Sequence, residues 1–402
     1  MSGTERLYYR DSHLIDFEAR VVDVTERVSG WTGVTLDRTA FYPTGGGQPS
    51  DTGMLSGARV VECVDREDEG VLHVIQGRTP KVGETVRGHI DWPRRLDHIQ
   101  QHTGQHILSQ AFIRLFQAET RGFRMMTEFS EIDVALNDPT DERIEQAIEL
   151  ANRIIWEDRT VRIREVTKEE AAALQLRKDS EREGELRLIE IEDYDLSPCG
   201  GTHAARTGEV GIICVRSWER AKGLVRLEFL AGGRVLQDYR RANQTARKAA
   251  ALFSTARDEA ADAAARLLEE NKALHKRLRS LEEIASRAEA EELLRHAEER
   301  DDGTRLVKHI FDNRSADALR HVALALVQHP KTAALLGSTD SDAARLVFAR
   351  SQDAPGNMNE LMRQACTLLE GRGGGRPDMA QGGGRLVEKL AEALEVAANN
   401  LT

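Results

Sequence analysis

The first 90 residues of the 402-residue chain carry their hydrophobic positions in short runs. Residues 19–24, 33–36 and 71–75 each cluster or alternate β-branched residues, and turn-forming residues separate them. Short apolar runs bounded by turn residues are typical of β-strands. We therefore expect a small β-barrel over residues 1–90.

Near Asp91 the hydrophobic positions change to a helical period. Asp91 can cap a helix that begins there, and Pro93 suits its first turn. A second helix is expected over residues 141–156. Strands are expected over residues 161–165, 188–191, 210–215 and 224–230. Helices and strands in this arrangement predict an α+β layer over residues 91–236.

Residues 237–302 are rich in Ala, Glu, Arg and Leu, and residues 237–300 contain neither Pro nor Gly. One heptad register places the following residues on a single seam: Ala260, Ala264, Leu267, Asn271, Leu274, Leu278, Leu281, Ala285 and Ala288. The pattern predicts one long helix. It fits a coiled coil in a homodimer as well as it fits a spacer helix packed on its own domain.

The last part of the chain, residues 303–402, predicts a small α/β domain. Strands are expected over residues 306–311, 333–337 and 346–349, and helices over 315–328 and 357–369. A glycine-rich loop over 371–384 is expected to precede a final amphipathic helix that ends near Ala398. The whole chain is thus expected to be an α+β multidomain protein.

Composition and charge narrow the class of protein. The formal net charge is −11, which disfavours a nucleic-acid binder unless the basic residues gather on one face. The four cysteines are widely and irregularly spaced, which excludes a disulfide framework and favours a reducing compartment. No run approaches the roughly 18 apolar residues of a membrane span. We therefore expect a soluble, cytoplasmic protein.

Two short motifs carry metal-binding chemistry. His102 and His106 are spaced i and i+4, so they share one face of a helix, although surface histidines also fall four apart. Cys199 and His203 flank a Gly-Gly-Thr segment that can fold tightly enough to aim both side chains inward. Three histidines and one cysteine suit tetrahedral Zn²⁺. Four protein ligands are typical of a structural site, whereas catalysis needs an open position.

The residues just before the histidine pair allow a further interpretation. His98 lies one turn before His102, and Asp97 precedes it. Either side chain could orient a metal ligand from outside the coordination shell. A surface histidine and a solvated carboxylate are the preferred interpretations.

Two glycine-rich runs remain. Gly45, Gly46 and Gly47 interrupt the predicted barrel between Thr44 and Gln48. They fit either a wall of a substrate pocket with exposed N–H groups or a bulged barrel corner. The second run, residues 373–384, lies between arginines and fits either a phosphate-binding segment or a linker.

Taken together, these motifs resemble a known family. The histidine pair, Cys199-Gly-Gly-Thr-His203 and Phe41-Tyr-Pro-Thr-Gly-Gly-Gly-Gln48 are similar to the editing domain of alanyl-tRNA synthetase and its free-standing relatives, the AlaX proteins. The run Gly373-Gly-Gly-Arg-Pro-Asp-Met-Ala-Gln381 resembles the DHHA1 domain of the same synthetase. The order of these parts is similar to the long form of AlaX over nearly the whole chain.

The resemblance implies a function and a set of site residues. The implied activity is hydrolysis, in trans, of tRNA for alanine that has been charged with serine or glycine. The implied zinc ligands are His102, His106, Cys199 and His203, and the implied pocket is Gly45, Gly46 and Gly47. Thr44, Gln48 and Gln105 are the candidate catalytic-site residues, with Thr44 placed to read the seryl hydroxyl. Bacterial synthetases often carry threonine at the position of Gln105.

The C-terminal domain would then hold the tRNA body. Candidate phosphate contacts are Arg363, Arg372, Arg376 and Lys389. Too few residues precede the barrel to form an aminoacylation domain, and no general base stands out.

Three rival functions stay open. One is editing of tRNA for threonine, and another is a tRNA-binding protein with a structural zinc. The third is a DHH-type phosphoesterase, which Asp97-His98-Ile99 fits poorly because the second histidine is missing.

Overall fold

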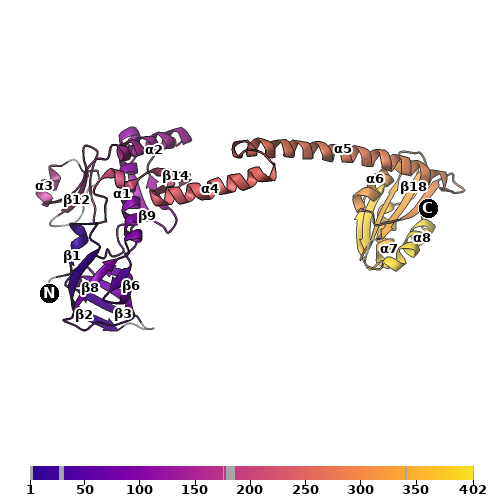
Figure 1. Cartoon of the computed structure of the whole chain (residues 1–402). Coiled ribbons are helices and arrows are strands. Elements are labelled where there is room, and N and C mark those ends of the chain that lie inside the picture. The colour runs from indigo at the N-terminus through magenta and orange to yellow at the C-terminus, as the bar shows by residue number, and fades with distance from the viewer. Residues whose placement is uncertain (1–2, 27–30, 175, 178–185, 340–341, 402) are drawn as a thin grey trace. The chain divides into compact units, whose positions relative to one another are not determined.

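A closed β-barrel begins the chain, as its hydrophobic pattern predicts. The computed structural model describes residues 3–26, 31–174, 176–177, 186–339 and 342–401. The barrel strands are β2 (Asp16–Glu26), β3 (Thr32–Leu36), β5 (Gly53–Leu55), β6 (Ala58–Asp65), β7 (Val71–Gln76) and β8 (Thr85–Ile90). They close in the order β2-β3-β7-β6-β5-β8 (Figure 1). A short parallel pair, β1 (Glu5–Arg6) with β4 (Arg38–Thr39), lies outside this order.

An α+β layer follows the barrel within the first of two units, Met1–Lys248 and Ala249–Thr402. Its helices are α1 (Trp92–Phe116), α2 (Asp141–Trp156) and α3 (Lys168–Ala172). One sheet, in the order β14-β15-β10-β9, comprises β9 (Thr120–Met125), β10 (Ser130–Val134), β14 (Ile213–Ala221) and β15 (Leu224–Ala231). The other comprises β11 (Val161–Val166), β12 (Leu186–Ile191) and β13 (Asp195–Pro198). The strand expected over 210–215 begins only at Ile213, because a 3₁₀ turn occupies Thr207–Val210.

The helix that carries the histidine pair is buried on most of its surface. Pro93 lies in the first turn of α1, as expected, and Gln117 ends the helix in the left-handed conformation, with φ 54°. Asp91 does not cap the helix through its side chain; its carboxylate accepts a hydrogen bond from Thr52 Oγ1 at 3.3 Å. A helix interior to its domain is normally apolar all round. The polar residues buried along α1 therefore mark a functional centre.

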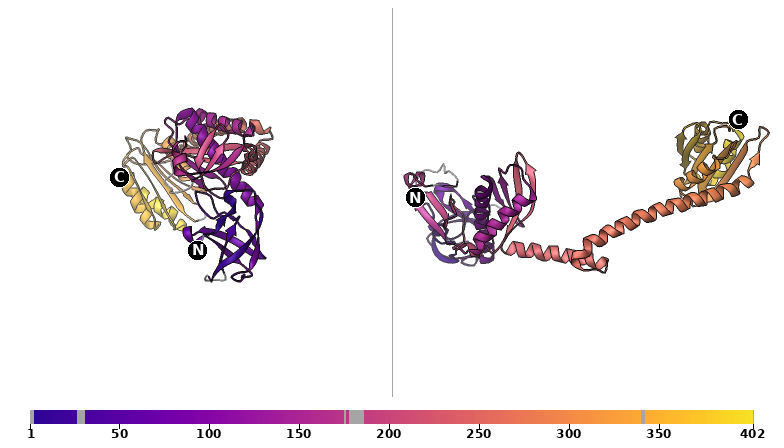
Figure 2. Two further views of the ribbon diagram at one scale, coloured as in Figure 1. Left: turned by 90° about the vertical axis from the view of Figure 1, so that its left-hand side faces the viewer. Right: turned by 90° about the horizontal axis from the view of Figure 1, so that it is seen from above.

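The long helix predicted over residues 237–302 is interrupted. Helix α4 (Gly233–Leu252) ends before α5 (Ala260–Arg295), and Ser254 between them takes the left-handed conformation, with φ 53°. The sequence prediction missed this break because residues 237–300 contain neither Pro nor Gly, the usual signals that end a helix. The predicted heptad seam lies on α5, whose first half stands clear of the second unit's sheet (Figure 2). Leu267, Leu274, Leu278 and Leu281 are all more than half exposed.

The second unit is a six-stranded sheet between two helical layers. Its strands are β16 (Glu298–Glu299), β17 (Arg305–Asp312), β18 (Thr332–Thr339), β19 (Ala344–Arg350), β21 (Met379–Gly384) and β20 (Arg372–Gly375), in that spatial order. The C-terminal part of α5 and α6 (Ala316–Leu326) pack on one face. Helices α7 (Met358–Leu368) and α8 (Leu390–Asn399) cover the other. None of the described helices is long and apolar enough to cross a membrane.

The prediction that residues 371–384 form a glycine-rich loop is wrong. Residues Arg372–Gly375 and Met379–Gly384 pair as an antiparallel β-hairpin. A Cβ added at Gly382 would lie 2.4 Å from Cys366 Sγ, and one at Gly373 would lie 2.7 Å from the same atom. The glycines therefore let the hairpin pack closely beneath α7 rather than make it flexible.

Candidate metal centre

The structure brings together the four side chains that the two sequence motifs single out. His102 and His106 lie one turn apart on α1, and Cys199 and His203 lie on the loop after β13. One potential ligand atom from each residue lies within 4.8 Å of all the others. Cys199 Sγ is 3.3 Å from both His102 Nε2 and His203 Nε2. The four groups thus converge on one point.

Close packing between the loop and α1 explains why position 201 is a glycine. A Cβ at Gly201 would lie 2.2 Å from His102 Cε1, so any larger residue would push the loop off the helix. Arg187 fixes the same loop from the other side, where its guanidinium donates to the carbonyls of Cys199 and Gly201. The loop therefore has very little freedom to move its two potential ligands.

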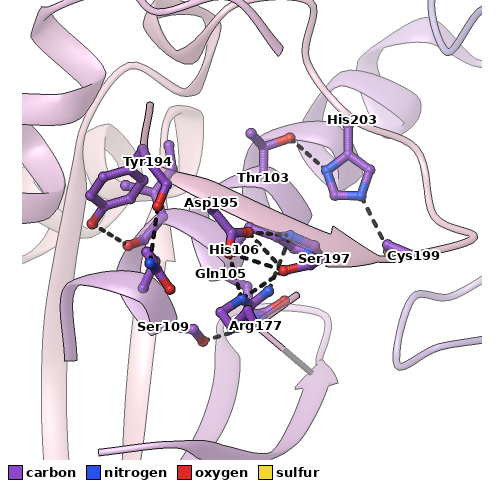
Figure 3. A network of polar contacts seen from close by, with 12 residues as sticks. Thr103, Gln105, His106, Ser109, Arg177, Tyr194, Asp195, Ser197, Cys199 and His203 are labelled. Carbon is purple, nitrogen blue, oxygen red and sulfur yellow. Dashed lines mark hydrogen bonds and ion pairs between the residues drawn. The ribbon is translucent and has the colours of Figure 1, made fainter. Parts of the chain in front are cut away.

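Each of the three imidazoles is held by its Nδ1 atom. His102 Nδ1 donates to Gln48 Oε1 at 2.7 Å. His106 Nδ1 lies 3.2 Å from Asp195 Oδ2, and His203 Nδ1 lies 3.3 Å from Thr103 Oγ1 (Figure 3). A hydrogen bond from Nδ1–H leaves the Nε2 lone pair free for a metal. All three rings can therefore present Nε2 to the shared point.

These residues fit a zinc ion. Zn–N and Zn–S bonds of about 2.0 and 2.3 Å, arranged as a tetrahedron, separate nitrogen from sulfur by about 3.5 Å. The observed separations of 3.3 Å agree with this value. Nitrogen and thiolate ligands favour Zn²⁺ over Mg²⁺ or Ca²⁺, which prefer oxygen.

Two groups of the cluster, Cys199 and His203, have the protonation states that a metal requires. Burial disfavours the Cys199 thiolate, but the three neighbouring histidines together outweigh it and hold the pKa of the thiol well below its usual range. Burial lowers the pKa of His203 to about 3, so that imidazole is neutral at pH 7. A thiolate beside a neutral imidazole is the protonation state that a metal requires. Burial lowers the pKa of His106, but hydrogen bonds to Asp195 and Cys199 outweigh it, so this pKa is raised.

A charged network surrounds His106. Asp195 is 4 % exposed, and its Oδ1 accepts from Arg177 Nε at 2.8 Å. Ser197 Oγ donates to both carboxylate oxygens of Asp195, at 3.0 and 2.9 Å (Figure 3). Burial opposes the charge of Asp195, but Arg177, His106 and Ser197 together outweigh it and lower the pKa of the carboxyl. Asp195 is therefore a buried carboxylate beside a potential ligand.

The glycine run of the barrel lies next to the cluster. Gly46 and Gly47 have φ values of 56° and 83° and form a tight turn in which Gly45 and Gln48 exchange backbone hydrogen bonds. A Cβ at Gly47 would lie 2.5 Å from the carbonyl oxygen of Phe123 on β9. The Phe123 ring is 5.2 Å from the His102 ring. The turn thus forms a wall beside the histidines.

Of the three candidate catalytic-site residues, Gln48 has the most direct contact with the cluster. Its Oε1 accepts from His102, and its Nε2 donates to Thr202 Oγ1 at 2.9 Å. Because both polar atoms of the Gln48 amide bond to protein groups, this side chain suits a role in positioning His102 better than contact with substrate. Thr44 is exposed, and its Oγ1 accepts from the Ser50 N–H.

Gln105 is buried beside the histidines on α1. Its Nε2 donates to Ser109 Oγ at 2.8 Å, and Ser109 also accepts from Thr120 Oγ1. With Nε2 held in this way, the Gln105 Oε1 atom is the remaining polar atom of the amide.

A buried ion pair joins the barrel to α1. The Arg95 guanidinium meets the Asp51 carboxylate with side-chain exposures of 0 % and 1 %. Arg95 also donates to the carbonyls of Ser12 and Ala40. Because Asp51 follows Gln48 and Arg95 precedes His102 by two turns, the pair keeps the glycine turn in register with the histidines.

The preferred interpretations of His98 and Asp97 are wrong. His98 is not a surface residue: it is 2 % exposed, its Nδ1 has no hydrogen-bond partner among the described residues, and burial lowers its pKa to about 4. Asp97 is not simply solvated, because it forms an ion pair with Arg234 at 2.7 Å. Neither residue orients a histidine of the cluster.

The four candidate phosphate contacts all lie in the second unit with exposed side chains. They are Arg363 on α7, Arg372 on β20, Arg376 in the hairpin turn and Lys389 before α8. Arg376 forms an ion pair with Asp378 at 3.3 Å.

Comparisons with known proteins agree with this arrangement. Family models match residues 4–94 (tRNA synthetases class II (A)), residues 186–228 (threonyl and alanyl tRNA synthetase second additional domain) and residues 302–402 (DHHA1 domain). These matches place the chain in the class of proteins related to alanyl- and threonyl-tRNA synthetases. The chain is 32 % identical to alanyl-tRNA editing protein AlaX-L of Pyrococcus horikoshii, over 99 % of this chain and 98 % of the relative. It belongs to this family of alanyl-tRNA editing proteins.

Other relatives are longer. Alanine–tRNA ligases of Pyrococcus abyssi and Halobacterium salinarum are 32 % and 35 % identical over 98 % and 99 % of this chain, which spans 43 % and 44 % of their lengths. The C-Ala domain of Aquifex aeolicus alanyl-tRNA synthetase matches 24 % of this chain and 91 % of that domain, with 31 % identity and a TM-score of 0.24.

Proposed function

We propose that this protein hydrolyses the ester bond of tRNA for alanine mischarged with serine or glycine, and that it uses one zinc ion. The ion would be held by His102, His106, Cys199 and His203. The observation that carries the proposal is the convergence of these four groups, with every Nδ1 atom turned outward to its own partner. When bound, zinc supplies Lewis acidity and can lower the pKa of a coordinated water.

The glycine turn and Gln105 would hold the substrate beside the cluster. Gly46 and Gly47 offer backbone N–H groups on the wall next to His102, where the terminal ribose or the ester would contact them. The Gln105 Oε1 atom offers an acceptor for a hydroxyl or an amine. A pocket built to hydrogen-bond a hydroxyl rejects the analogue that lacks one, because its polar groups are left unpaired. This mechanism separates serine from alanine, with Thr44 as a second candidate contact.

The second unit would bind the body of the tRNA. Arg363, Arg372, Arg376 and Lys389 are the candidate phosphate contacts, and phosphate contacts position a nucleic acid without reading its sequence. We also expect a homodimer through the exposed leucines of α5.

The decisive experiment measures release of serine from Ser-tRNA(Ala), with Ala-tRNA(Ala) and Ser-tRNA(Thr) as control substrates. Wild type and Cys199→Ala are compared, and zinc content is determined for both. Selective hydrolysis of Ser-tRNA(Ala) that is lost together with zinc in Cys199→Ala supports the proposal. Wild-type protein that is folded and zinc-loaded but inactive on all three substrates overturns the hydrolase function.

Two observations favour alternative functions. Four protein donors at one centre are typical of structural zinc, so an inactive zinc-loaded protein that still binds tRNA would be a binding module. The family model over residues 186–228 covers threonyl as well as alanyl synthetases, so hydrolysis of Ser-tRNA(Thr) alone would retain the chemistry and change the substrate.

A further inference from the structure

Two groups with opposite hydrogen-bonding demands face the same nitrogen of His106. Asp195 Oδ2 lies 3.2 Å from His106 Nδ1, and so does Arg177 Nη2. The carboxylate can only accept a hydrogen bond, whereas the guanidinium can only donate one. Because Nδ1 of a neutral imidazole either carries a proton or does not, only one of these contacts is a hydrogen bond at a time.

The choice decides whether His106 can bind a metal. When Nδ1–H donates to Asp195, the Nε2 lone pair is free to face Cys199 and the other imidazoles. When Nδ1 accepts from Arg177, the proton resides on Nε2 and blocks it. His102 and His203 have no such rival, since their Nδ1 atoms contact Gln48 and Thr103 respectively.

We infer that Asp195 is a positioning residue that makes His106 a metal ligand, and that Arg177 opposes it by favouring the tautomer that cannot bind. The inference rests on the metal site of the proposed function. Ser197 supports Asp195 by donating to both of its oxygens, at 3.0 and 2.9 Å. The Asp195 side chain is fully buried, while the Arg177 side chain is 11 % exposed.

Arg177 and Asp195 also border a cavity. This cavity of about 590 Å³ is lined in part by Gln110, Arg114, Arg177, Tyr194 and Asp195. Arg177 is the more exposed member of the pair, whereas Asp195 is fully buried in β13.

The test measures metal affinity of the full chain, by competition with a chromophoric chelator for Zn²⁺ and by the visible absorption of bound Co²⁺. Asp195→Asn keeps the shape of the side chain and removes its charge. We expect a 10- to 100-fold loss of affinity, the range found when outer partners of metal-bound histidines are removed. Arg177→Gln removes the rival donor to His106 but also the ion-pair partner of Asp195 at 2.8 Å, so it should lose less affinity than Asp195→Asn.

Asp133→Asn is the matched control, because Asp133 also pairs with an arginine, Arg226, at 2.8 Å but bonds to no histidine among the described residues. It should leave metal affinity unchanged. Metal-free Asp195→Asn loses the buried partner of Arg177 and should be less stable than the metal-free wild type. Urea unfolding with and without zinc isolates the positioning role, which predicts a smaller gain in stability on adding zinc than the wild type shows.

Three outcomes would overturn the inference. Asp195→Asn could bind zinc as tightly as wild type, or Arg177→Gln could lose as much affinity as Asp195→Asn, which would make the pair a structural clamp. Metal-free Asp195→Asn could also fail to fold; Ser197→Ala then serves in its place, and an affinity equal to wild type refutes the role. If wild type itself binds no metal, the proposed zinc site fails instead, and the two failures are distinguishable.

Discussion

The buried ion pair between Arg95 and Asp51 offers the sharpest test of how the barrel supports the metal centre. We consider Asp51→Asn, which preserves volume and removes the negative charge. In the wild type the Asp51 carboxylate accepts from Arg95 and from the Tyr42 N–H at 2.6 Å. After the substitution the guanidinium stays buried, with only the carbonyls of Ser12 and Ala40 as full partners.

The size of the effect follows from burial. Side-chain exposures of 0 % and 1 % mean that water cannot solvate the guanidinium that is left behind. Removing one partner of such a pair costs about 3–5 kcal/mol of stability. Since a domain has a total stability of about 5–15 kcal/mol, the variant should be folded but much weakened.

The chain provides its own reporter. All four tryptophans, Trp31, Trp92, Trp156 and Trp218, lie before residue 249, so tryptophan fluorescence follows unfolding of the first unit alone. Urea titrations of metal-free protein, extrapolated linearly to water, yield the free energy of unfolding.

The control is Asp133→Asn, whose partner Arg226 leaves the carboxylate 21 % exposed. That pair should contribute no more than about 1 kcal/mol. If Asp51→Asn costs as little as Asp133→Asn, the argument from burial is wrong, and the barrel does not depend on this pair for its attachment to α1.

Three further predictions concern other parts of the molecule. Gly47→Ala should abolish deacylation and weaken metal binding, because its Cβ would lie 2.5 Å from the Phe123 carbonyl oxygen at a φ of 83°; Gly57→Ala, at an open turn, should leave both unchanged. Burial lowers the pKa of His73 to about 4 in the folded barrel, whereas the unfolded chain takes up the proton near pH 6.5. The stabilisation that the neutral His73 provides is therefore complete above pH 6.5, and the free energy of unfolding falls by about 3 kcal/mol as the pH falls to 4. In urea titrations of His73→Gln the free energy of unfolding should depend less steeply on pH over this range, and an unchanged dependence would contradict the assignment. Replacing Leu274 with Glu should convert a dimer into a monomer in light scattering, since this side chain is 64 % exposed within one chain; a wild type that is already monomeric would leave α5 a spacer.

The elements with strong periodicity could be predicted from the sequence. The helix over residues 141–156 has the bounds expected for it, and the barrel has the expected strand content, because alternation and capping are local signals. The break between α4 and α5 carries no Pro or Gly, so local signals missed it. The hairpin at residues 372–384 was mistaken for a loop because its glycines serve close packing on Cys366, which only the tertiary structure reveals.

The candidate site divides in the same way. Spacing within two short motifs was enough to group the histidines and Cys199. The outer partners Asp195, Thr103 and Arg177 could not be predicted, because each is joined to its histidine by a contact across at least 71 positions of the chain. Gln48 was visible as part of the glycine motif, but its hold on His102 spans 54 positions and depends on the docking of the barrel.

The way in which the metal centre is assembled has a consequence for biosynthesis. Its groups run from Gln48 to His203, so about half of the chain must leave the ribosome before the centre can close. The barrel and α1 emerge much earlier and have to persist with a cysteine-free, half-built site. A zinc ion, if bound as proposed, could therefore meet all four ligands only late in synthesis, after the loop that carries Cys199 and His203 has packed against α1.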